Sequence, residues 1–381
     1  MRIGITCYPT YGGSGVVATE LGIELAARGH EVHFITSSQP FRLTGRDQNI
    51  HFHEVSMMNY PLFEHPPYDL ALATRMAEVA EFYSLDLLHV HYAIPHSVSA
   101  HLAKEMLRAK GIHLPFITTL HGTDITLVGM DPSYLPITRF GIEQSDGVTA
   151  ISQHLADRTH EAFGTTKPIE VIRNFVNCDL YCRNAERVAE LRPKFAREDE
   201  KLLVHLSNFR PVKRVTDVVE VFARVAKAMP ARLMMIGDGP DRFSAEFLAK
   251  RLGVFDRIHF LGKQDNVNDL LAVADLMVMP SEMESFGLAA LEAMACRVPA
   301  VATRVGGVPE LIEHEKNGLL YSVGDVESMA AGAVALLSDP ARLEAMTSAA
   351  RKTAQDGFCA SGIIRKYEEF YARVVAESKR S

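Results

Sequence analysis

The sequence predicts an α/β protein of two doubly wound domains, each built on a parallel sheet. The chain has 381 residues, whereas a single α/β core stops growing at roughly 250 to 300 residues. Short apolar runs alternate with segments of helical periodicity in both halves, a pattern typical of βαβ units. Apolar residues make up 47% of the chain and charged residues 23%, a balance typical of globular proteins.

The first half opens with a strand, a glycine-rich turn and a helix. The strand is Arg2–Cys7, the turn is Gly12–Gly15, and the helix ends near Arg28–His30. A second strand, Glu31–Thr36, follows at once, so the opening is a βαβ unit with a right-handed crossover. Four further apolar runs are predicted strands of the same sheet: Leu87–His91, Phe116–Leu120, Gly147–Ile151 and Ile169–Ile172.

A charged stretch from Arg183 to Glu200 separates these strands from a second series. We therefore expect an N-terminal domain over residues 1–172 and a C-terminal domain over 173–362, which face each other across a cleft. The strands predicted for the second domain are Leu202–Leu206, Arg232–Ile236, Ile258–Leu261, Leu276–Met279 and Ala300–Thr303. The last helical stretch, 363–381, can pack on either domain, the N-terminal one included.

Composition argues against several classes of partner. The net charge of −7 provides no broad basic surface, so nucleic acid is not expected to bind. No apolar run approaches the roughly 18 residues of a membrane helix, and the pattern of a signal peptide is missing. We therefore expect a cytoplasmic protein without membrane insertion. The oligomeric state stays open, and a homo-oligomer is compatible with the sequence.

The five cysteines predict reduced thiols. Their number is odd, and all except Cys178 and Cys182 lie far apart in the sequence. No histidine pair stands beside them at the spacing of a zinc site. Cys7 and Cys296 lie in apolar contexts and are expected in the core. No bound metal is expected.

Two loops of the first half are candidates for ligand binding, because open parallel sheets bind ligands at the carboxyl ends of their strands. Gly12–Gly15 lacks the third glycine of the dinucleotide fingerprint. It can bring the backbone close to an anion or sugar at a helix N-terminus, or simply form a tight turn. The second loop, His121–Asp124, begins with a histidine that can hydrogen-bond a sugar hydroxyl or move a proton, although structural histidines are common.

Two loops of the second half carry the strongest candidates. Ser207–Arg214 brings three cationic residues to a strand-to-helix turn. Such a turn can bind a diphosphate, or its basic side chains can simply be solvated. Pro280–Leu288 leads into an apolar helix that contains Glu292, and its last backbone N–H groups can bind a ligand oxygen. A buried carboxylate needs hydrogen-bond donors, which a ribose diol supplies. Spacing alone leaves open whether Glu284 and Glu292 are functional.

Glu284 and Glu292 match the E-x7-E signature, and the sequence resembles the family 4 glycosyltransferases of the GT-B fold, two Rossmann-like domains that face a cleft. The resemblance covers essentially the whole chain. It is strongest to the family members that join N-acetylglucosamine to L-malate in bacillithiol biosynthesis. The stretches that carry it are Ile5–Pro9, Gly12–Val17, His33–Ser37, Pro40–Leu43, His89–His96, Leu120–Ile125, Arg139–Asp146 and Gly262–Val267.

The resemblance implies a hexosyltransferase that transfers N-acetylglucosamine from UDP-N-acetylglucosamine to L-malate with retention of the α configuration. It also implies that no metal or other cofactor takes part. Three alternatives remain open: a transferase with another acceptor, such as inositol phosphate or a lipid; a UDP-N-acetylglucosamine 2-epimerase; and a sensor that binds a nucleotide sugar without turnover. Release of UDP with a panel of acceptors distinguishes them.

The resemblance further implies roles for single residues. Glu292 binds the ribose diol, Glu284 the sugar 3-hydroxyl and Lys213 the diphosphate, while His121 lines the reaction centre. The catalytic set is therefore His121, Lys213 and Glu284. The remaining donor-binding positions are Gly13, Ser14, Asn208, Lys263, Gln264, Phe286, Gly287 and Leu288.

The residues assigned to malate are Ser14, Tyr92, Thr123 and Arg139, because a guanidinium matches a carboxylate in bidentate geometry. Two positions depart from the family pattern. Related transferases have an arginine where Asn208 stands, which leaves Arg210 or Arg214 as the second cation. Arg297 stands where a glycine is usual, and no role is assigned to it.

Overall fold

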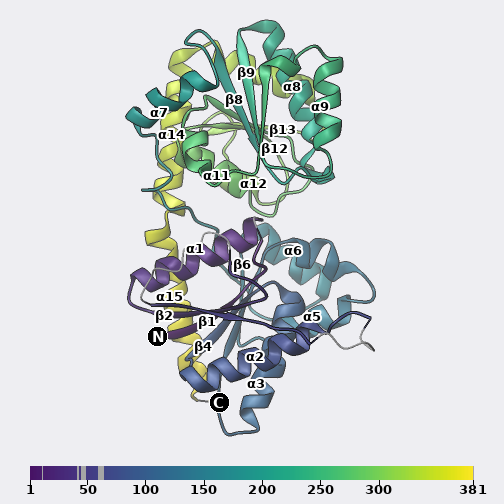
Figure 1. Ribbon diagram of the computed structural model, residues 1–381, viewed down its shortest axis with the longest axis vertical. Coiled ribbons are helices and arrows are strands. Elements are labelled where there is room, and N and C mark those ends of the chain that lie inside the picture. Colours follow the sequence, from purple (N-terminus) through teal and green to yellow (C-terminus); the bar gives the residue numbers. More distant parts are fainter. Residues whose placement is uncertain (11, 41–42, 44–48, 59–63, 381) are drawn as a thin grey trace. The chain divides into compact units, whose positions relative to one another are not determined.

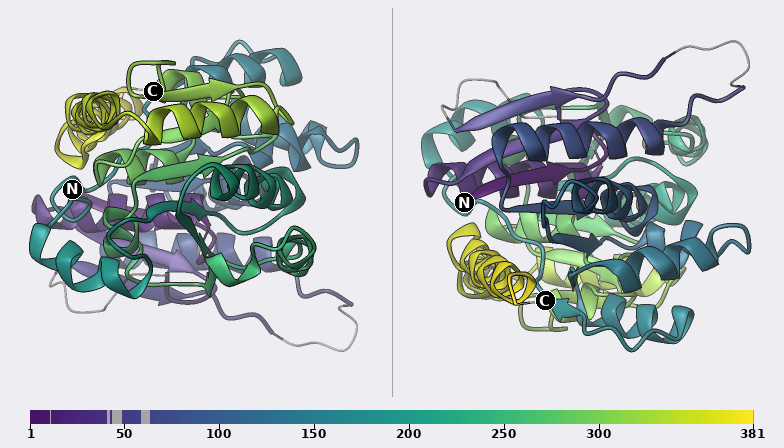
Figure 2. Two further views of the ribbon diagram at one scale, coloured as in Figure 1. Left: turned by 90° about the horizontal axis from the view of Figure 1, so that it is seen from above. Right: turned by 90° about the horizontal axis from the view of Figure 1, so that it is seen from below.

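The computed structural model describes residues 1–10, 12–40, 43, 49–58 and 64–380. The chain forms two compact units: an N-terminal unit of Met1–Asn174 and Ser361–Ser381, and a C-terminal unit of Phe175–Ala360. Each unit is a parallel sheet with helices on its faces (Figures 1 and 2). The sequence prediction placed the boundary after residue 172. Part of the stretch 40–43 lies outside the described residues.

The sheet of the N-terminal unit has the order β3-β2-β1-β4-β5-β6-β7. Its strands are β1 (Arg2–Thr6), β2 (Glu31–Thr36), β3 (Ile50–Glu54), β4 (Leu87–His91), β5 (Phe116–Leu120), β6 (Gly147–Ala150) and β7 (Glu170–Val171). Its helices are α1 (Gly13–Ala27), α2 (Tyr68–Tyr83), α3 (Val98–Arg108), α4 (Thr123–Thr126), α5 (Leu135–Gln144), α6 (Gln153–Phe163) and α15 (Ala360–Ser378), with short turns η1 (Ala93–Ser97) and η2 (Val128–Met130). The strand order reverses between β1 and β4, which we call the N-terminal switch point.

The sheet of the C-terminal unit has the order β10-β9-β8-β11-β12-β13. Its strands are β8 (Lys201–Leu206), β9 (Ala231–Ile236), β10 (Ile258–Gly262), β11 (Leu276–Met279), β12 (Ala300–Thr303) and β13 (Gly318–Tyr321). Its helices are α7 (Ala185–Leu191), α8 (Val215–Ala228), α9 (Arg242–Arg251), α10 (Val267–Ala272), α11 (Leu288–Ala295), α12 (Val308–Leu311), α13 (Val326–Leu337) and α14 (Pro340–Phe358), with short turns η3 (Arg192–Lys194), η4 (Pro211–Lys213) and η5 (Phe255–Arg257). Here the order reverses between β8 and β11, the C-terminal switch point.

Two strands, β3 and β13, were missed by the sequence analysis, whereas every predicted strand is present. Both missed strands lie at a sheet edge. An edge strand is covered less than a central one and need not be a continuous apolar run. The sequence of β3, Ile-His-Phe-His-Glu, alternates apolar and polar side chains. The length of β13, four residues, equals that of β11 and β12, which were predicted, so length does not explain why β13 was missed.

The C-terminal helix α15 completes the core of the N-terminal unit. Tyr367 and Tyr371 on this helix are buried, and the Tyr371 hydroxyl hydrogen-bonds Nδ1 of His89 on β4 at 2.7 Å. At the start of β6, a Cβ on Gly147 would lie 2.7 Å from the ring of Phe370. Glycine at this position therefore lets α15 approach the sheet closely.

Cys178 and Cys359 form a disulfide, so the prediction of reduced thiols was wrong for this pair. Their Cα atoms lie 5.5 Å apart although 181 residues separate them. Backbone hydrogen bonds between Val176 and the Phe358–Ala360 segment align the two chain segments. Sequence spacing does not show which distant segments become neighbours. Cys7, Cys182 and Cys296 are free thiols.

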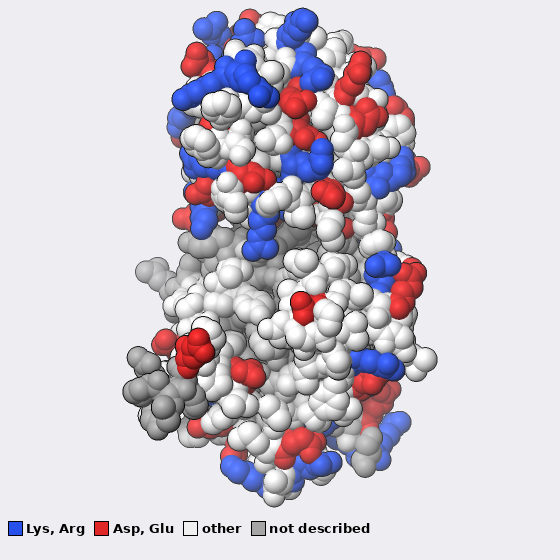
Figure 3. Space-filling view, turned by 90° about the vertical axis from the view of Figure 1, so that its right-hand side faces the viewer, with Lys and Arg blue, Asp and Glu red and all other residues white. Residues whose placement is uncertain are grey.

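Basic and acidic side chains are interspersed over the face drawn in Figure 3. The face drawn there shows no continuous basic surface. Among the helices that the structure describes, none combines the length and the apolar character needed to cross a membrane.

Candidate functional site

Two loops of the C-terminal unit leave its sheet on either side of the switch point. One follows β8 and contains η4, and the other follows β11 and leads into α11. The backbone N–H of Glu282 donates to the carbonyl of Val212 at 2.8 Å and ties the loops together. Open α/β sheets bind ligands at this kind of crevice.

Lys213 and Glu284 meet at the C-terminal switch point. The Nζ atom of Lys213 lies 2.6 Å from Oε1 of Glu284, and the hydroxyl of Ser281 donates to the same oxygen at 2.9 Å. The side chains are only 22% and 12% exposed, so the cation is held in one place by a partly buried, charge-assisted bond. The structure thus brings together two of the three residues predicted to be catalytic.

Glycines allow close backbone packing beneath these loops. A Cβ on Gly306 would lie 1.7 Å from the carbonyl oxygen of Glu284, and one on Gly237 would lie 1.8 Å from that of Ser207. The left-handed φ angles of Gly306 and Gly237 also favour glycine. The sequence analysis missed both positions, although Gly237-Asp-Gly-Pro240 is a recognisable turn signal.

Glu292 lies inside α11 and is only 8% exposed. Its Oε1 accepts a hydrogen bond of 2.9 Å from the hydroxyl of Tyr181. Arg351 on α14 donates to the carbonyls of Tyr181 at 2.7 Å and Cys178 at 3.0 Å, and so holds this segment against α11. Tyr181 was missed because it lies in an irregular segment more than a hundred residues from Glu292.

The N-terminus of α11 presents backbone donors at the same edge of the sheet. Gly287 adopts a φ of 96° at the N-cap, and no side chain caps the helix. Phe286 is buried against Phe358 and fixes the turn. The first N–H groups of a helix have no intrahelical partner and carry partial positive charge. The backbone from Phe286 to Leu288 therefore offers donors at a helix start without a side-chain cap, and binding of an anion there stays a prediction.

The cations near Lys213 differ in their partners. Arg214 donates through Nε to Oδ2 of Asp217 at 2.7 Å, so its guanidinium is already paired. Asn208 and Arg210 are exposed on either side of buried Phe209. In the described part of the chain, Arg210 has no ion-pair partner, which favours it over Arg214 as the second cation.

Lys263 and Gln264 follow β10 at the carboxyl edge of the same sheet. The side-chain amide of Gln264 donates to the carbonyl of Leu261 at 2.7 Å, which folds this loop back on its strand. Two strands separate β10 from β11. These two residues therefore lie to one side of the Lys213–Glu284 pair.

The N-terminal switch point is lined by aromatic rings and the start of α1. Tyr8, after β1, contacts Tyr92, after β4, with ring centroids 5.3 Å apart. A Cβ on Gly15 would lie 2.5 Å from the carbonyl oxygen of Tyr8, so the glycine turn packs directly on the β1 loop. Gly13 and Ser14 form the first turn of α1, which no side chain caps.

Four buried histidines, His89, His91, His96 and His121, form what we call the histidine cluster. Nδ1 of His91 and Nε2 of His121 share a hydrogen bond of 2.8 Å. Burial lowers the pKa of His89 and His121 to about 3 and that of His96 to about 4, and it lowers the pKa of His91 well below its ordinary value. The rings are therefore neutral near pH 7, and His121 is suited to hydrogen bonding.

Tyr92 and Thr123 lie beside His121. Their hydroxyl oxygens are 2.9 Å apart, and the rings of Tyr92 and His121 stack with centroids separated by 5.6 Å. The buried carboxylate of Asp124 accepts hydrogen bonds from the backbone N–H groups of Ala93, His121 and Gly122, which joins the loops after β4 and β5. Arg139 lies on α5, where it pairs with Glu143 at 2.8 Å.

Two family models match the chain, one in each half. Residues 11–180 match the model of Glycosyltransferase Family 4, and residues 187–353 match that of Glycosyl transferases group 1. The chain is 50% identical over 380 residues to the N-acetyl-alpha-D-glucosaminyl L-malate synthase of Bacillus anthracis, which covers 100% of this chain and 98% of that protein. It is 27% identical to an uncharacterized glycosyltransferase of Methanocaldococcus jannaschii, with 94% of each chain covered.

Solved structures share the fold at lower identity. The Anabaena protein HepE in complex with UDP and glucose superposes with a TM-score of 0.81 at 21% identity and covers 98% of this chain and 99% of its own. The sucrose-phosphate synthase of Thermosynechococcus elongatus gives a TM-score of 0.81 at 22% identity, with 99% and 100% covered. The predicted fold class is confirmed.

Proposed function

The chain belongs to the glycosyltransferases that combine a family 4 and a group 1 domain, and we propose that it transfers N-acetylglucosamine from UDP-N-acetylglucosamine to the hydroxyl group of L-malate. The observation that carries the proposal is the 50% identity, over the whole chain, with the malate synthase of Bacillus anthracis. The product would be the first intermediate of bacillithiol biosynthesis.

The C-terminal switch point would bind the donor. Lys213 is held in place by Glu284, whose carboxylate also accepts a hydrogen bond from Ser281. A diphosphate there would accept hydrogen bonds from Lys213 and from the first turn of α11. Glu284 would then accept from the sugar 3-hydroxyl. Glu292 would bind the ribose diol, with Tyr181 keeping its carboxylate oriented. Lys263 and Gln264 would contact the uracil edge.

Charge develops on the diphosphate as UDP leaves. The C1–O bond to the phosphate breaks while a bond forms from C1 to the malate oxygen, and the malate hydroxyl proton passes to the departing phosphate on the same face. This route retains the α configuration without a covalent intermediate. Lys213 and the α11 donors act where the negative charge increases, and such preorganised donors contribute most to catalysis.

The N-terminal switch point would bind malate and the reactive end of the sugar. His121 is neutral because burial lowers its pKa to about 3, so it would hydrogen-bond a sugar hydroxyl without transferring a proton. Ser14, Tyr92 and Thr123 offer further donors and acceptors. Arg139 would leave Glu143 to bind a malate carboxylate, and this exchange costs little because an exposed ion pair contributes only about 0 to 1 kcal/mol.

We propose that the transfer proceeds without a metal or other cofactor. The sequence contains no Asp-x-Asp motif. Lys213, Arg210 and the N-terminus of α11 supply positive charge at the place proposed for the diphosphate. UDP-N-acetylglucosamine is consumed as a substrate.

The test is release of UDP from UDP-N-acetylglucosamine with L-malate, D-malate and inositol phosphate in parallel, with the sugar product identified by mass spectrometry. We expect L-malate to accelerate release far above the hydrolysis background and to yield a conjugate of the two substrates. Acceleration by inositol phosphate alone would overturn the acceptor. Free N-acetylmannosamine formed without any acceptor would indicate an epimerase, and binding without release would indicate a sensor.

A further inference from the structure

Three side chains gather on the edge strands of the N-terminal sheet, away from both switch points. The strands β2 and β3 pair in parallel, and His33 lies directly opposite His51. Glu31 stands two residues before His33 on β2, and side chains two residues apart point to the same face of a sheet. Glu31 is the first residue of β2, so this group lies at the amino end of the strands, whereas the proposed substrate sites lie at their carboxyl ends.

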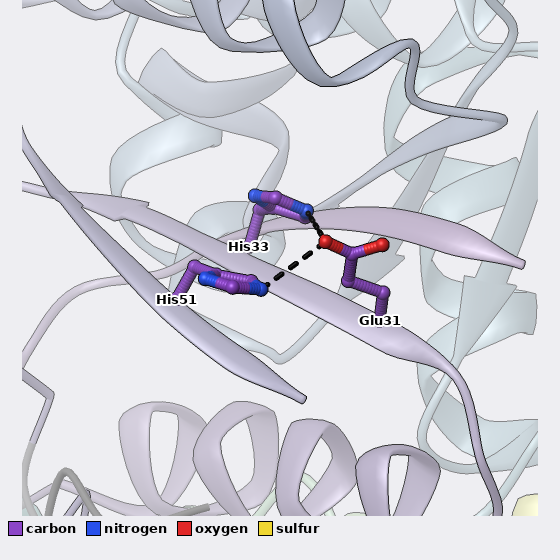
Figure 4. Close-up of side chains that lie close together, drawn as sticks. All are labelled: Glu31, His33 and His51. Atoms are coloured by element: carbon purple, nitrogen blue, oxygen red, sulfur yellow. Dashed lines mark ion pairs between the residues drawn. The ribbon is translucent and has the colours of Figure 1, made fainter. Parts of the chain in front are cut away.

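The nitrogen and oxygen atoms of these side chains converge. Nε2 of His33 lies 3.4 Å from Oε1 of Glu31, and Nε2 of His51 lies 3.2 Å from the same oxygen. Figure 4 shows both imidazole rings turned toward that one carboxylate. One potential ligand atom from each residue lies within 4.8 Å of the other two. Two ligands bound at about 2.1 Å to a tetrahedral zinc ion stand about 3.4 Å apart, close to the two measured distances.

The hydrogen bonding of His33 leaves one polar atom unsatisfied. Its side chain is fully buried, and Nδ1 shares a hydrogen bond of 2.9 Å with Nε2 of His53. Nε2 has no hydrogen-bond partner in the part of the chain that the structure describes. If His33 donates to His53, the lone pair of its Nε2 faces a lone pair of Glu31 Oε1; if His53 donates, the Nε2 hydrogen of His33 faces Oε1 of Glu31 at 3.4 Å without forming a hydrogen bond. A shared cation removes the conflict in the first case.

We infer that Glu31, His33 and His51 bind a divalent transition-metal ion, with Zn²⁺ as the best match. Two imidazole nitrogens and one carboxylate suit Zn²⁺, whereas Mg²⁺ and Ca²⁺ prefer oxygen ligands. His53 would act as the outer hydrogen-bond partner that fixes the tautomer of His33. A water molecule would complete the tetrahedron, since the three residues supply only three ligands.

The proposed metal site is accessible to solvent. His51 and Glu31 are 37% and 39% exposed, and a cavity of about 470 Å³, lined in part by His53 and Tyr83, opens next to His33.

A bound ion would join the edge strand β3 to β2. The ion would therefore stabilise the edge of the sheet and take no part in sugar transfer. No metal was expected from the sequence, because no histidine pair stands beside the cysteines at zinc spacing, the transfer scheme of the family requires none, and β3 was not predicted.

The experiment is isothermal titration calorimetry of Zn²⁺ into the full-length protein after removal of metals with EDTA. We expect the wild type to bind one ion per chain at this site. His51→Gln and Glu31→Gln should each weaken binding at least about tenfold, because each removes a ligand. His113→Gln changes an exposed histidine outside the cluster and should bind Zn²⁺ like the wild type.

Thermal unfolding provides a second readout and a check on folding. Both altered side chains are partly exposed, so the variants should unfold near the wild-type temperature without metal, and Zn²⁺ should raise that temperature only in the wild type and in His113→Gln. His121→Asn tests the histidine cluster as the competing site. The proposal is overturned if the wild type binds no Zn²⁺, or if His51→Gln and Glu31→Gln bind it unchanged while His121→Asn does not.

Discussion

At the C-terminal switch point Lys213 and Glu284 form an ion pair, whereas the N-terminal switch point presents neutral histidines and tyrosines beside the buried Asp124. Both sheets reverse their strand order in the same way and present loops at the carboxyl edge. The loops differ in chemistry: the diphosphate proposed for the C-terminal site favours fixed positive charge, whereas the sugar and malate hydroxyl groups proposed for the N-terminal site favour neutral donors and acceptors. We therefore propose two different binding tasks for similar topologies, and four predictions examine this difference.

Acidification should destabilise the N-terminal unit far more than the C-terminal unit. Burial lowers the pKa of His89 and His121 to about 3 and of His96 to about 4, below the ordinary value of about 6.5. The unfolded chain then binds more protons below pH 6.5, so this stability is complete above that pH and declines as the pH falls toward about 3. Protonation of these three histidines in the unfolded chain should lower the free energy of unfolding by about 4 kcal/mol at pH 5.5.

Hydrogen–deuterium exchange measured by mass spectrometry at pH 7.5 and 5.5, with exchange times corrected for pH, checks this prediction. Peptides from β4 and β5 should lose protection at pH 5.5. Peptides from β8 and β9 serve as the control, because His205 is the one histidine of the C-terminal unit with a lowered pKa. Equal loss of protection in the two units would contradict the prediction.

Lys213→Gln should lower kcat about 10²- to 10³-fold, since it removes a positioned donor to the charge that develops on the departing phosphate. Steady-state release of UDP measures the effect. Lys227→Gln is the matched control, because Lys227 is exposed in the last turn of α8 and should leave kcat unchanged. If both variants keep wild-type kcat, the C-terminal switch point is not the place where the leaving group is stabilised.

Glu292→Gln should weaken UDP binding about tenfold, because a buried acceptor of two hydrogen bonds is replaced by an amide. Tyr181→Phe should act in the same direction and less strongly, since it removes only the hydroxyl that orients Glu292. Calorimetry with UDP measures both affinities. Glu282→Gln alters an exposed carboxylate of the loop that leads into α11 and should bind UDP normally. Unchanged affinity in Glu292→Gln would contradict the proposed contact with the ribose.

Most of the fold was predictable from the sequence because buried parallel strands are continuous apolar runs. Edge strand β3 escaped prediction for the opposite reason: its histidines alternate with apolar residues. Their places after strands made Lys213 and Glu284 candidates, and the resemblance to the family 4 glycosyltransferases supplied the roles predicted for them. Tyr181, Gly306 and the Cys178–Cys359 pair were not, because each acts through a neighbour that is distant in sequence.

The smallest predicted effect concerns the second cation at the C-terminal switch point. Arg210→Ala should raise the KM for UDP-N-acetylglucosamine roughly two- to fivefold, the equivalent of about 0.5 to 1 kcal/mol for an exposed charge. Arg214→Ala is the comparison. It should leave KM nearly unchanged and lower the unfolding temperature, because the buried carboxylate of Asp217 loses its ion pair with Arg214. The reverse outcome would mean that a diphosphate draws Arg214 away from Asp217, and that the pair seen in the structure exchanges partners when the donor binds.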